Sequence, residues 1–116
     1  MPWTVLHHPA FEPEFAELPE PVQDELLASE LVIEQVGPSQ GRPLVDTLNG
    51  SDHANMKEVR FKVAGGVWRF AFAFDPTRQA VVLCGGDKSG GSEDRFYKRL
   101  IDKADKRFND WIKDQK

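Results

Sequence analysis

Residues 57–88, KEVRFKVAGGVWRFAFAFDPTRQAVVLCGGDK, carry the pattern that decides the fold. Apolar residues alternate with charged or small residues on both sides of the glycine pair Gly65-Gly66. Alternation with a period of two is typical of a strand with one buried face, and two such runs joined by a glycine pair predict a hairpin. After a second turn at residues 75–79, the chain returns as a third strand over residues 80–88. The segment therefore predicts an antiparallel β-meander.

The two turns also predict the register of this meander. If Gly65-Gly66 is the first turn, the facing pairs on the apolar side are Val63 with Trp68, Phe61 with Phe70, and Val59 with Phe72, and on the other side Lys62 faces Arg69. A four-residue second turn gives the pairs Val81 with Phe74, Leu83 with Phe72, Cys84 with Ala71, and Gly86 with Arg69. Like charges opposed across two strands cost about 0.2–1 kcal/mol, so the pair of cations requires a nearby anion or side chains that splay apart.

The polar side of this sheet is expected to form a trough with small residues on its floor and basic residues at its rim. Its members are Arg60, Lys62, Arg69, Ala71, Ala73, Cys84, Gly86 and Lys88. Guanidinium groups hold phosphate through paired charged hydrogen bonds, and small neighbours let a ligand backbone approach. We therefore expect an open phosphodiester-binding surface, with a solvated outer face of the sheet as the alternative.

The segments before the meander predict a short strand and two helices. Residues 3–7 form the strand, and the helical pattern from Phe11 to Val36 is split at Leu18–Pro21 into a helical hairpin that ends at Gly37-Pro38. In the second helix the apolar stripe is Val22, Leu26, Leu27, Leu31 and Ile33, while Gln23, Asp24, Glu30 and Glu34 face water. Residues 39–56 are polar and rich in turn residues, which predicts either a functional loop or a mobile linker.

A long helix is predicted at the end of the chain, with Ser92 as its N-cap and Glu93 and Asp94 in its first turn. Apolar residues recur in it at helical spacing: Tyr97, Leu100, Ile101, Ala104, Phe108, Trp111 and Ile112. We expect this stripe to pack on the aromatic face of the sheet and to leave the basic trough open on the far side.

Length and composition favour one soluble, cytoplasmic domain over residues 1–116, without a membrane span. The net charge is −4, but residues 1–56 carry −9 and residues 57–116 carry +5, an asymmetry that is typical of a polyanion-binding half. Cys84 is the only cysteine, and we expect it to be a buried thiol. His7, His8 and His53 lack metal-ligand spacing, and Gly86-Asp87-Lys88-Ser89 does not fit the Walker A loop, so neither a metal nor a nucleotide triphosphate is expected.

Four stretches, residues 42–48, 56–61, 66–72 and 86–97, resemble the RelE/HigB toxins of type II toxin–antitoxin systems, in their phage Gp49-like branch. The Lys57-Glu58-x-Arg60 strand followed by Trp68-Arg69 carries most of this resemblance. It implies a RelE/microbial RNase-like α+β fold: an antiparallel sheet with an N-terminal helical hairpin and a C-terminal helix. It also implies metal-free and cofactor-free cleavage of messenger RNA, usually on the ribosome, and inhibition by a cognate antitoxin protein.

The sequence pattern and this resemblance together suggest roles for eight residues. The catalytic candidates are Arg60, Arg69, Lys88 and Tyr97, and the further RNA-binding candidates are His53, Lys57, Lys62 and Lys98. Arginine can stabilise the crowded phosphate but cannot move a proton at neutral pH, which leaves Lys57, Lys88, Tyr97 or His53 for proton transfer. Unperturbed Lys and Tyr titrate near ~10, and we expect the cationic surroundings to lower both pKa values.

The alternative is a non-catalytic module of the same fold, either a ParE-like gyrase inhibitor or a member that only binds antitoxin. An acidic net charge is unusual for a toxin that approaches ribosomal RNA. The nuclease hypothesis requires Arg60, Arg69 and Lys88 to converge on one open pocket, with the phenylalanines pointing away. Scattered cations, or cations neutralised by internal carboxylates, would contradict it.

Overall fold

The computed structural model of the chain describes residues 2–114. The elements follow one another as β1 (Thr4–His7), α1 (Phe11–Ala16), α2 (Glu20–Val36), the 3₁₀ turn η1 (Gly37–Ser39), β2 (Val45–Thr47), β3 (Met56–Val63), β4 (Gly66–Phe74), β5 (Gln79–Asp87) and α3 (Glu93–Asp114). The predicted strand, helical hairpin, meander and terminal helix are all present. Two elements, η1 and β2, were not predicted; β2 lies within the stretch interpreted as a loop.

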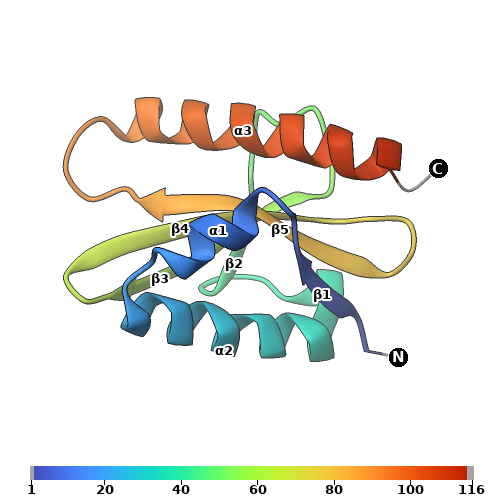
Figure 1. The fold of residues 1–116 in the computed structure, drawn as a ribbon, viewed down its shortest axis with the longest axis horizontal. Helices are drawn as coiled ribbons and strands as arrows, with labels where there is room; N and C mark the ends of the chain where they lie inside the picture. The colour runs from blue at the N-terminus through green and yellow to red at the C-terminus, as the bar shows by residue number, and fades with distance from the viewer. Residues whose placement is uncertain (1, 115–116) are drawn as a thin grey trace.

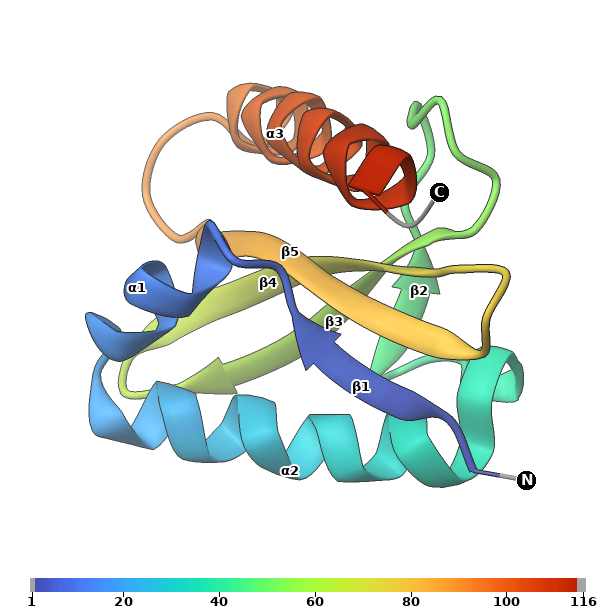
Figure 2. The same cartoon turned by 45° about the vertical axis from the view of Figure 1, so that its right-hand side comes forward.

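The five strands form one sheet in the order β1-β5-β4-β3-β2. Strand β1 runs parallel to β5, and the other neighbours are antiparallel. Helix α2 lies on one side of this sheet and α3 lies on the other, while α1 lies in front of the strands between the levels of these two helices (Figure 1). The turned view in Figure 2 separates the same three layers. No helix among residues 2–114 is long and apolar enough to cross a membrane.

The β3–β4 hairpin turns one residue earlier than predicted. Its central residues are Ala64 and Gly65, with φ of 52° and 77°, and Val63 pairs with Gly66. Two positive φ values match the right-handed twist of the flanking strands, which favours this turn. The shift moves every partner by two positions and so leaves each side chain on its expected face. The predicted pairing of Lys62 with Arg69 is wrong, and Arg60 faces Arg69 instead.

The β4–β5 register is correct in one half and shifted in the other. Cys84 pairs with Ala71 and Gly86 pairs with Arg69, as predicted. An irregularity between Ala71 and Phe72 then shifts the pairing by one residue. Phe72 therefore pairs with Val82 rather than Leu83, and Phe74 pairs with Ala80 rather than Val81. A bulge of this kind adds one unpaired residue and increases local twist.

The aromatic face of the sheet is covered by the helical hairpin and not by the terminal helix. Phe70, Phe72 and Phe74 are buried with side chains of α1 and α2 in one core cluster. The opposite, small-residue face packs against α3 in a second cluster, where Ala71 and Ala73 meet Leu100, Ala104 and Phe108. The prediction of an open trough is therefore wrong, because α3 covers most of it.

The expected stripe of α3 is confirmed, whereas that of α2 needs three corrections. Leu27 and Leu31 are 45% and 62% exposed, and Glu30 is buried. The buried face of α2 is centred on Val22, Leu26, Ser29 and Ile33. Burial of the Glu30 carboxylate is compensated by His7, whose Nε2 lies 2.6 Å from Glu30 Oε2. Charged groups are buried when such a partner is present.

The contact between β5 and the aromatic face yields a stability prediction. A Cβ atom at Gly85 would lie 2.0 Å from Cδ1 of Phe70, a side chain that is fully buried. We expect Gly85→Ala to lower the free energy of unfolding by about 1–3 kcal/mol, because a packed core resists added volume. Urea denaturation measures this change.

The matched control for this prediction is Gly41→Ala. No atom lies within 4 Å of a Cβ built at Gly41. Its free energy of unfolding should stay the same or rise slightly, because alanine restricts the unfolded chain. Equal stabilities of the two variants would contradict the described packing of β5 on Phe70.

Candidate functional site

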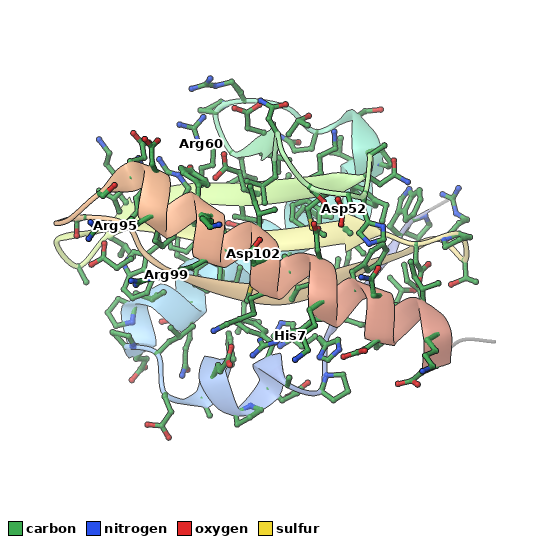
Figure 3. All side chains as sticks on the ribbon, turned by 90° about the horizontal axis from the view of Figure 1, so that it is seen from above. His7, Asp52, Arg60, Arg95, Arg99 and Asp102 are labelled. Carbon is green, nitrogen blue, oxygen red and sulfur yellow. The ribbon has the colours of Figure 1, made fainter. Side chains whose placement is uncertain are left out.

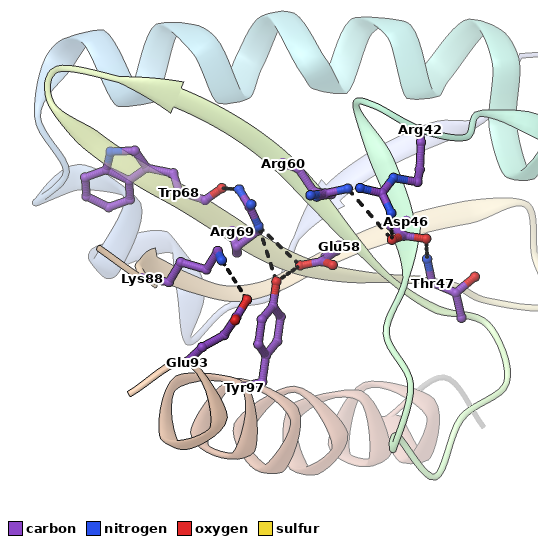
Figure 4. A network of polar contacts seen from close by, with 10 residues as sticks. All are labelled: Arg42, Asp46, Thr47, Glu58, Arg60, Trp68, Arg69, Lys88, Glu93 and Tyr97. Carbon is purple, nitrogen blue, oxygen red and sulfur yellow. Dashed lines mark hydrogen bonds and ion pairs between the residues drawn. The ribbon is translucent and has the colours of Figure 1, made fainter. Parts of the chain in front are cut away.

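Three side chains from three elements meet where the N-terminal half of α3 crosses the sheet (Figure 4). The Tyr97 hydroxyl donates a hydrogen bond of 2.8 Å to Oε1 of Glu58. Nε of Arg69 donates to the Tyr97 oxygen at 3.3 Å and lies 3.7 Å from the same Glu58 oxygen. Nη1 of Arg69 donates to the carbonyl oxygen of Trp68 at 2.9 Å, which fixes the guanidinium. The result is a carboxylate, a phenol and a guanidinium in mutual contact.

Strand pairing and helix packing explain this meeting. Glu58 pairs with Ala71, which lies two residues after Arg69 on β4. Side chains two residues apart share one face of a strand, so Glu58 and Arg69 both lie on the face that α3 covers. Tyr97 lies three residues before Leu100, which is buried in the core beneath α3. Residues three apart share one face of a helix, so the helix carries the phenol to the sheet. Glu58 and Arg69 are each only 6% exposed.

Burial raises the pKa values of two of the three groups. Burial is the main cause of the raised pKa of Glu58, and it is partly opposed by the hydrogen bond from Tyr97 and the charge of Arg69. The pKa of Tyr97 is also raised, first by burial and then by its hydrogen bond to Glu58. The expectation of a lowered tyrosine pKa is therefore wrong, because burial and the neighbouring carboxylate both favour the neutral phenol. Tyr97 is a neutral hydrogen-bond donor at physiological pH.

Arg60 lies beside this cluster and faces Arg69 across the two strands. Its Nη1 is 3.8 Å from Oδ2 of Asp46 on β2, a long contact. Its Nε is buried and has no hydrogen-bond partner. The anion that two opposed cations require is thus supplied from within the chain, by Glu58 on one side and Asp46 on the other.

Lys88 lies at the end of β5, next to the ring of Tyr97. Its Nζ is 5.9 Å from the ring centroid and donates a 2.7 Å hydrogen bond to Oε1 of Glu93 in the first turn of α3. Glu93 is exposed, and the hydrogen bond from Lys88 lowers its pKa. Lys88 therefore joins the cluster from the solvent side, through a contact that water can reach.

His53 lies at the other end of α3. Its Nε2 is 2.8 Å from Oδ1 of Asn109, and its ring stands edge-on to Phe108. Asn109 follows Tyr97 by twelve residues, a rise of about 18 Å along a helix. The structure therefore separates His53 from the cluster.

The three lysine candidates for RNA binding are also apart from Glu58. Lys57 faces Phe72 and so points to the opposite side of the sheet, where its Nζ donates to Oγ1 of Thr47. Lys62 is exposed near the tip of the β3–β4 hairpin, and Lys98 is exposed on α3 beside Tyr97. Within residues 2–114, no group of three His, Cys, Asp or Glu side chains could hold a metal ion.

The geometry meets the requirement of the nuclease hypothesis in part. The phenylalanines of β4 point away, and Arg69 and Lys88 lie next to Tyr97, whereas Arg60 points toward Asp46. Each cation, however, lies near a carboxylate, which is the arrangement that was expected to contradict the hypothesis, and α3 covers the face that was expected to be open. A nuclease mechanism therefore requires the substrate to displace some of these contacts.

Sequence reasoning missed Glu58, which it treated only as a polar position in an alternating strand. The signal was its place two residues before Arg60, on the face that also carries Arg69. Cys84, by contrast, is a buried thiol as predicted, and burial raises its pKa to about 12.

Comparison with solved structures identifies the fold. The chain is similar to a double mutant of the E. coli toxin RelE in the free state, with a TM-score of 0.65. The match covers 92% of this chain and 98% of that chain at 13% identity, so it shows a RelE-type toxin fold and no more.

Sequence comparison gives the family. "Putative toxin HigB3" of Mycobacterium tuberculosis is 48% identical over 81 residues, which cover 70% of this chain and 68% of that protein. "Putative toxin HigB2" of the same organism is 47% identical over 78 residues, which cover 66% of this chain but only 38% of that protein. Residues 13–109 match the family described as Phage derived protein Gp49-like (DUF891). The chain belongs to this Gp49-like family and is a toxin of the RelE/HigB type.

The contacts of Glu58 predict how its pKa responds to mutation. In the wild-type protein it should titrate above the ordinary glutamate value, because burial disfavours the charged form. Tyr97→Phe should raise the pKa of Glu58 further, because it removes the hydrogen bond that favours the carboxylate. Carbon-13 NMR titration of the glutamate carboxyl groups measures both values. A Glu58 pKa at or below that of exposed glutamates, in either protein, would contradict the described site.

Proposed function

We propose that this toxin is an endoribonuclease that cleaves messenger RNA by attack of a ribose 2′-hydroxyl on the adjacent phosphorus. The observation that carries the proposal is the contact of Glu58, a carboxylate with a raised pKa, with Arg69 and Tyr97. A general base works best when its pKa approaches the working pH, and burial is a common way to raise that of a carboxyl group. Because burial is the main cause of the raised pKa, the shift supports the proposal only together with the contacts of Glu58 to Arg69 and Tyr97.

In the proposed reaction, Glu58 removes the proton from the 2′-hydroxyl as the oxygen attacks phosphorus. The bond from phosphorus to the 5′-oxygen breaks, and Lys88 or Tyr97 gives a proton to that leaving oxygen. The products are a 2′,3′-cyclic phosphate and a 5′-hydroxyl. Arg69 and Arg60 stabilise the added negative charge, which fixed donors do well in a site shielded from water. These side chains carry out the steps without a metal or cofactor.

Substrate entry requires two exchanges at the site. The phosphate takes the place of Glu93 at Lys88, a change favoured by the exposure of that ion pair, since exposed pairs are weak. The 2′-hydroxyl takes the place of the Tyr97 hydroxyl as donor to Glu58. Tyr97 is only half-buried, so its side chain can swing away without unfolding α3. Both exchanges keep the guanidinium of Arg69 in position.

The proposed partners follow from the family. We propose that a cognate antitoxin protein inhibits this toxin and that messenger RNA is cleaved on the ribosome in the cytoplasm. The net charge of −4 disfavours approach to free RNA over long distances. A ribosome that presents the messenger would compensate for this weak attraction.

The first functional prediction concerns Arg69→Ala. Loss of a fixed donor to the phosphate should lower the single-turnover rate on bound RNA by about 10²–10³. Growth arrest on induction should be relieved in parallel. The matched control is Lys113→Ala, which removes one exposed charge from the far end of α3 and should cut at the wild-type rate. Urea unfolding checks that both variants are folded. Unchanged cleavage by a folded Arg69→Ala variant would contradict the proposed mechanism.

The second functional prediction concerns the pH dependence of cleavage. The rate should rise with pH through the pKa of Glu58, which lies above the ordinary 4.5, because only the carboxylate accepts a proton. Glu58→Gln should lose this rise and lower the rate by about 10²–10⁴. Rates measured across pH 4 to 8 at constant ionic strength test this. If Glu58→Gln keeps the same rise of the rate with pH, Glu58 is not the general base.

A specific observation favours a second function, that of a non-catalytic toxin. All three central cations have carboxylate neighbours, as expected for a structural charge network. A ParE-like gyrase inhibitor, or a protein that only binds antitoxin, fits this arrangement. Loss of DNA supercoiling after induction, with messenger RNA intact, would favour the gyrase inhibitor. Intact supercoiling and intact RNA together would favour antitoxin binding alone.

A further inference from the structure

A cavity of ≈ 380 Å³ lies between the end of β5, the following loop and the first turns of α3. Four basic side chains line it, against a single carboxylate, Asp87. The basic residues are Lys88, Arg95, Arg99 and Lys103. Figure 3 places Arg99 and Arg60 on opposite sides of α3, so this flank is distinct from the cluster around Glu58.

Within residues 2–114, Lys88 is the only one of these four basic side chains that forms a salt bridge, and its partner is Glu93. Arg95, Arg99 and Lys103 are exposed, and none of them forms a salt bridge with any residue from 2 to 114. The one carboxylate, Asp87, is held by the protein: its Oδ1 accepts hydrogen bonds from the backbone N–H groups of Val67 and Ser89. The cavity therefore presents a positive surface that an anion could neutralise.

The shape of the flank suits a chain of phosphates better than a single ion. Arg95, Arg99 and Lys103 are spaced four residues apart, which places them on one stripe of α3 at steps of about 6 Å. A second hollow continues past Arg99 and Lys103 to Lys106 and Arg107, and it also contains His8. Asp102 and Asp110 line this second hollow and limit its positive charge, so the first cavity is the stronger part.

The mouth of the cavity allows a close approach. Gly90 and Gly91 line it, and a Cβ built on either would meet no atom within 4 Å. Lys88 belongs both to the cavity lining and to the contacts of Tyr97. A strand that leaves the cluster at Glu58 past Lys88 would enter this cavity directly.

We propose that Arg95, Arg99 and Lys103 bind the phosphodiester backbone of the RNA strand beyond the reacting bond. This inference rests on the proposed function, because it takes RNA as the ligand. It adds a binding surface on the side of α3 next to the end of β5. Of the site residues predicted from sequence, only Lys88 lies on this surface. Backbone contacts of this kind hold the strand without reading its sequence.

The test measures binding separately from cleavage. The probe is a single-stranded RNA in which every 2′-hydroxyl is methylated, so that it cannot be cut by the proposed reaction. Fluorescence anisotropy at several salt concentrations gives Kd and its salt dependence for the full chain. Arg99→Ala should raise Kd severalfold at low salt and lower the slope of log Kd against log salt by about 0.7, the value for one lost phosphate contact. The triple variant Arg95→Ala, Arg99→Ala, Lys103→Ala should lower this slope by about three times as much.

The matched control is again Lys113→Ala, which removes one positive charge from the same helix outside both hollows. It should change neither Kd nor the salt slope appreciably. All replaced residues are exposed and alanine favours helix, so each variant should fold, which circular dichroism and urea unfolding check. Equal RNA affinity of Arg99→Ala and Lys113→Ala would overturn the inference.

Cleavage by the same variants separates this inference from the proposed function. With cuttable RNA, the triple variant should raise KM and keep kcat, whereas Arg69→Ala should lower kcat. If neither the wild-type protein nor any variant cuts RNA, alone or with ribosomes, but the triple variant still loses binding, the catalytic proposal fails and the binding flank stands. If the wild-type protein cuts RNA and the triple variant has the wild-type KM, the flank is not a binding surface.

Discussion

Small side chains on one face of β4 determine how closely α3 can approach the sheet. Ala71 and Ala73 are fully buried beneath Leu100 and Ala104, so β4 presents only small side chains to the helix at this point. This close packing brings Tyr97 within hydrogen-bond distance of a strand carboxylate. Larger residues at these positions would lift the helix and separate the phenol from the sheet. The architecture of the site thus depends on a packing contact one turn away from it.

Much of the fold could be predicted from sequence because alternation identifies the faces of a strand. It could not identify which helix covers which face, since both α2 and α3 carry apolar stripes. The hairpin register was off because the residue at positive φ is Ala64, whereas a glycine pair one position later gave the stronger turn signal. Nothing in the sequence marks the β4–β5 irregularity. Leu27 and Leu31 were misplaced because leucine is weak evidence of burial at the edge of a stripe.

The cationic side chains of the site could be predicted from the sequence, but Glu58, the proposed general base, could not. Basic residues on a strand beside small residues pointed to Arg60 and Arg69, whereas Glu58 looked like an ordinary solvated position. Only the covering helix buries that carboxyl group and raises its pKa. The free cations of α3 were missed for a related reason: on a long amphipathic helix, charged residues are expected to face water. Their common exposure beside the end of β5 is a property of the folded chain.

The chemistry of the product ends tests the central claim most directly. If Glu58 takes a proton from a ribose hydroxyl beside Arg69, every cut must leave a 2′,3′-cyclic phosphate, or the phosphate that forms when it opens, opposite a 5′-hydroxyl. Mass spectrometry of a short RNA cleaved by the purified protein, alone or with ribosomes, identifies these ends. The account predicts cyclic phosphate and 5′-hydroxyl termini. Fragments with 3′-hydroxyl and 5′-phosphate ends would contradict it, because they require water rather than the ribose as the attacking group.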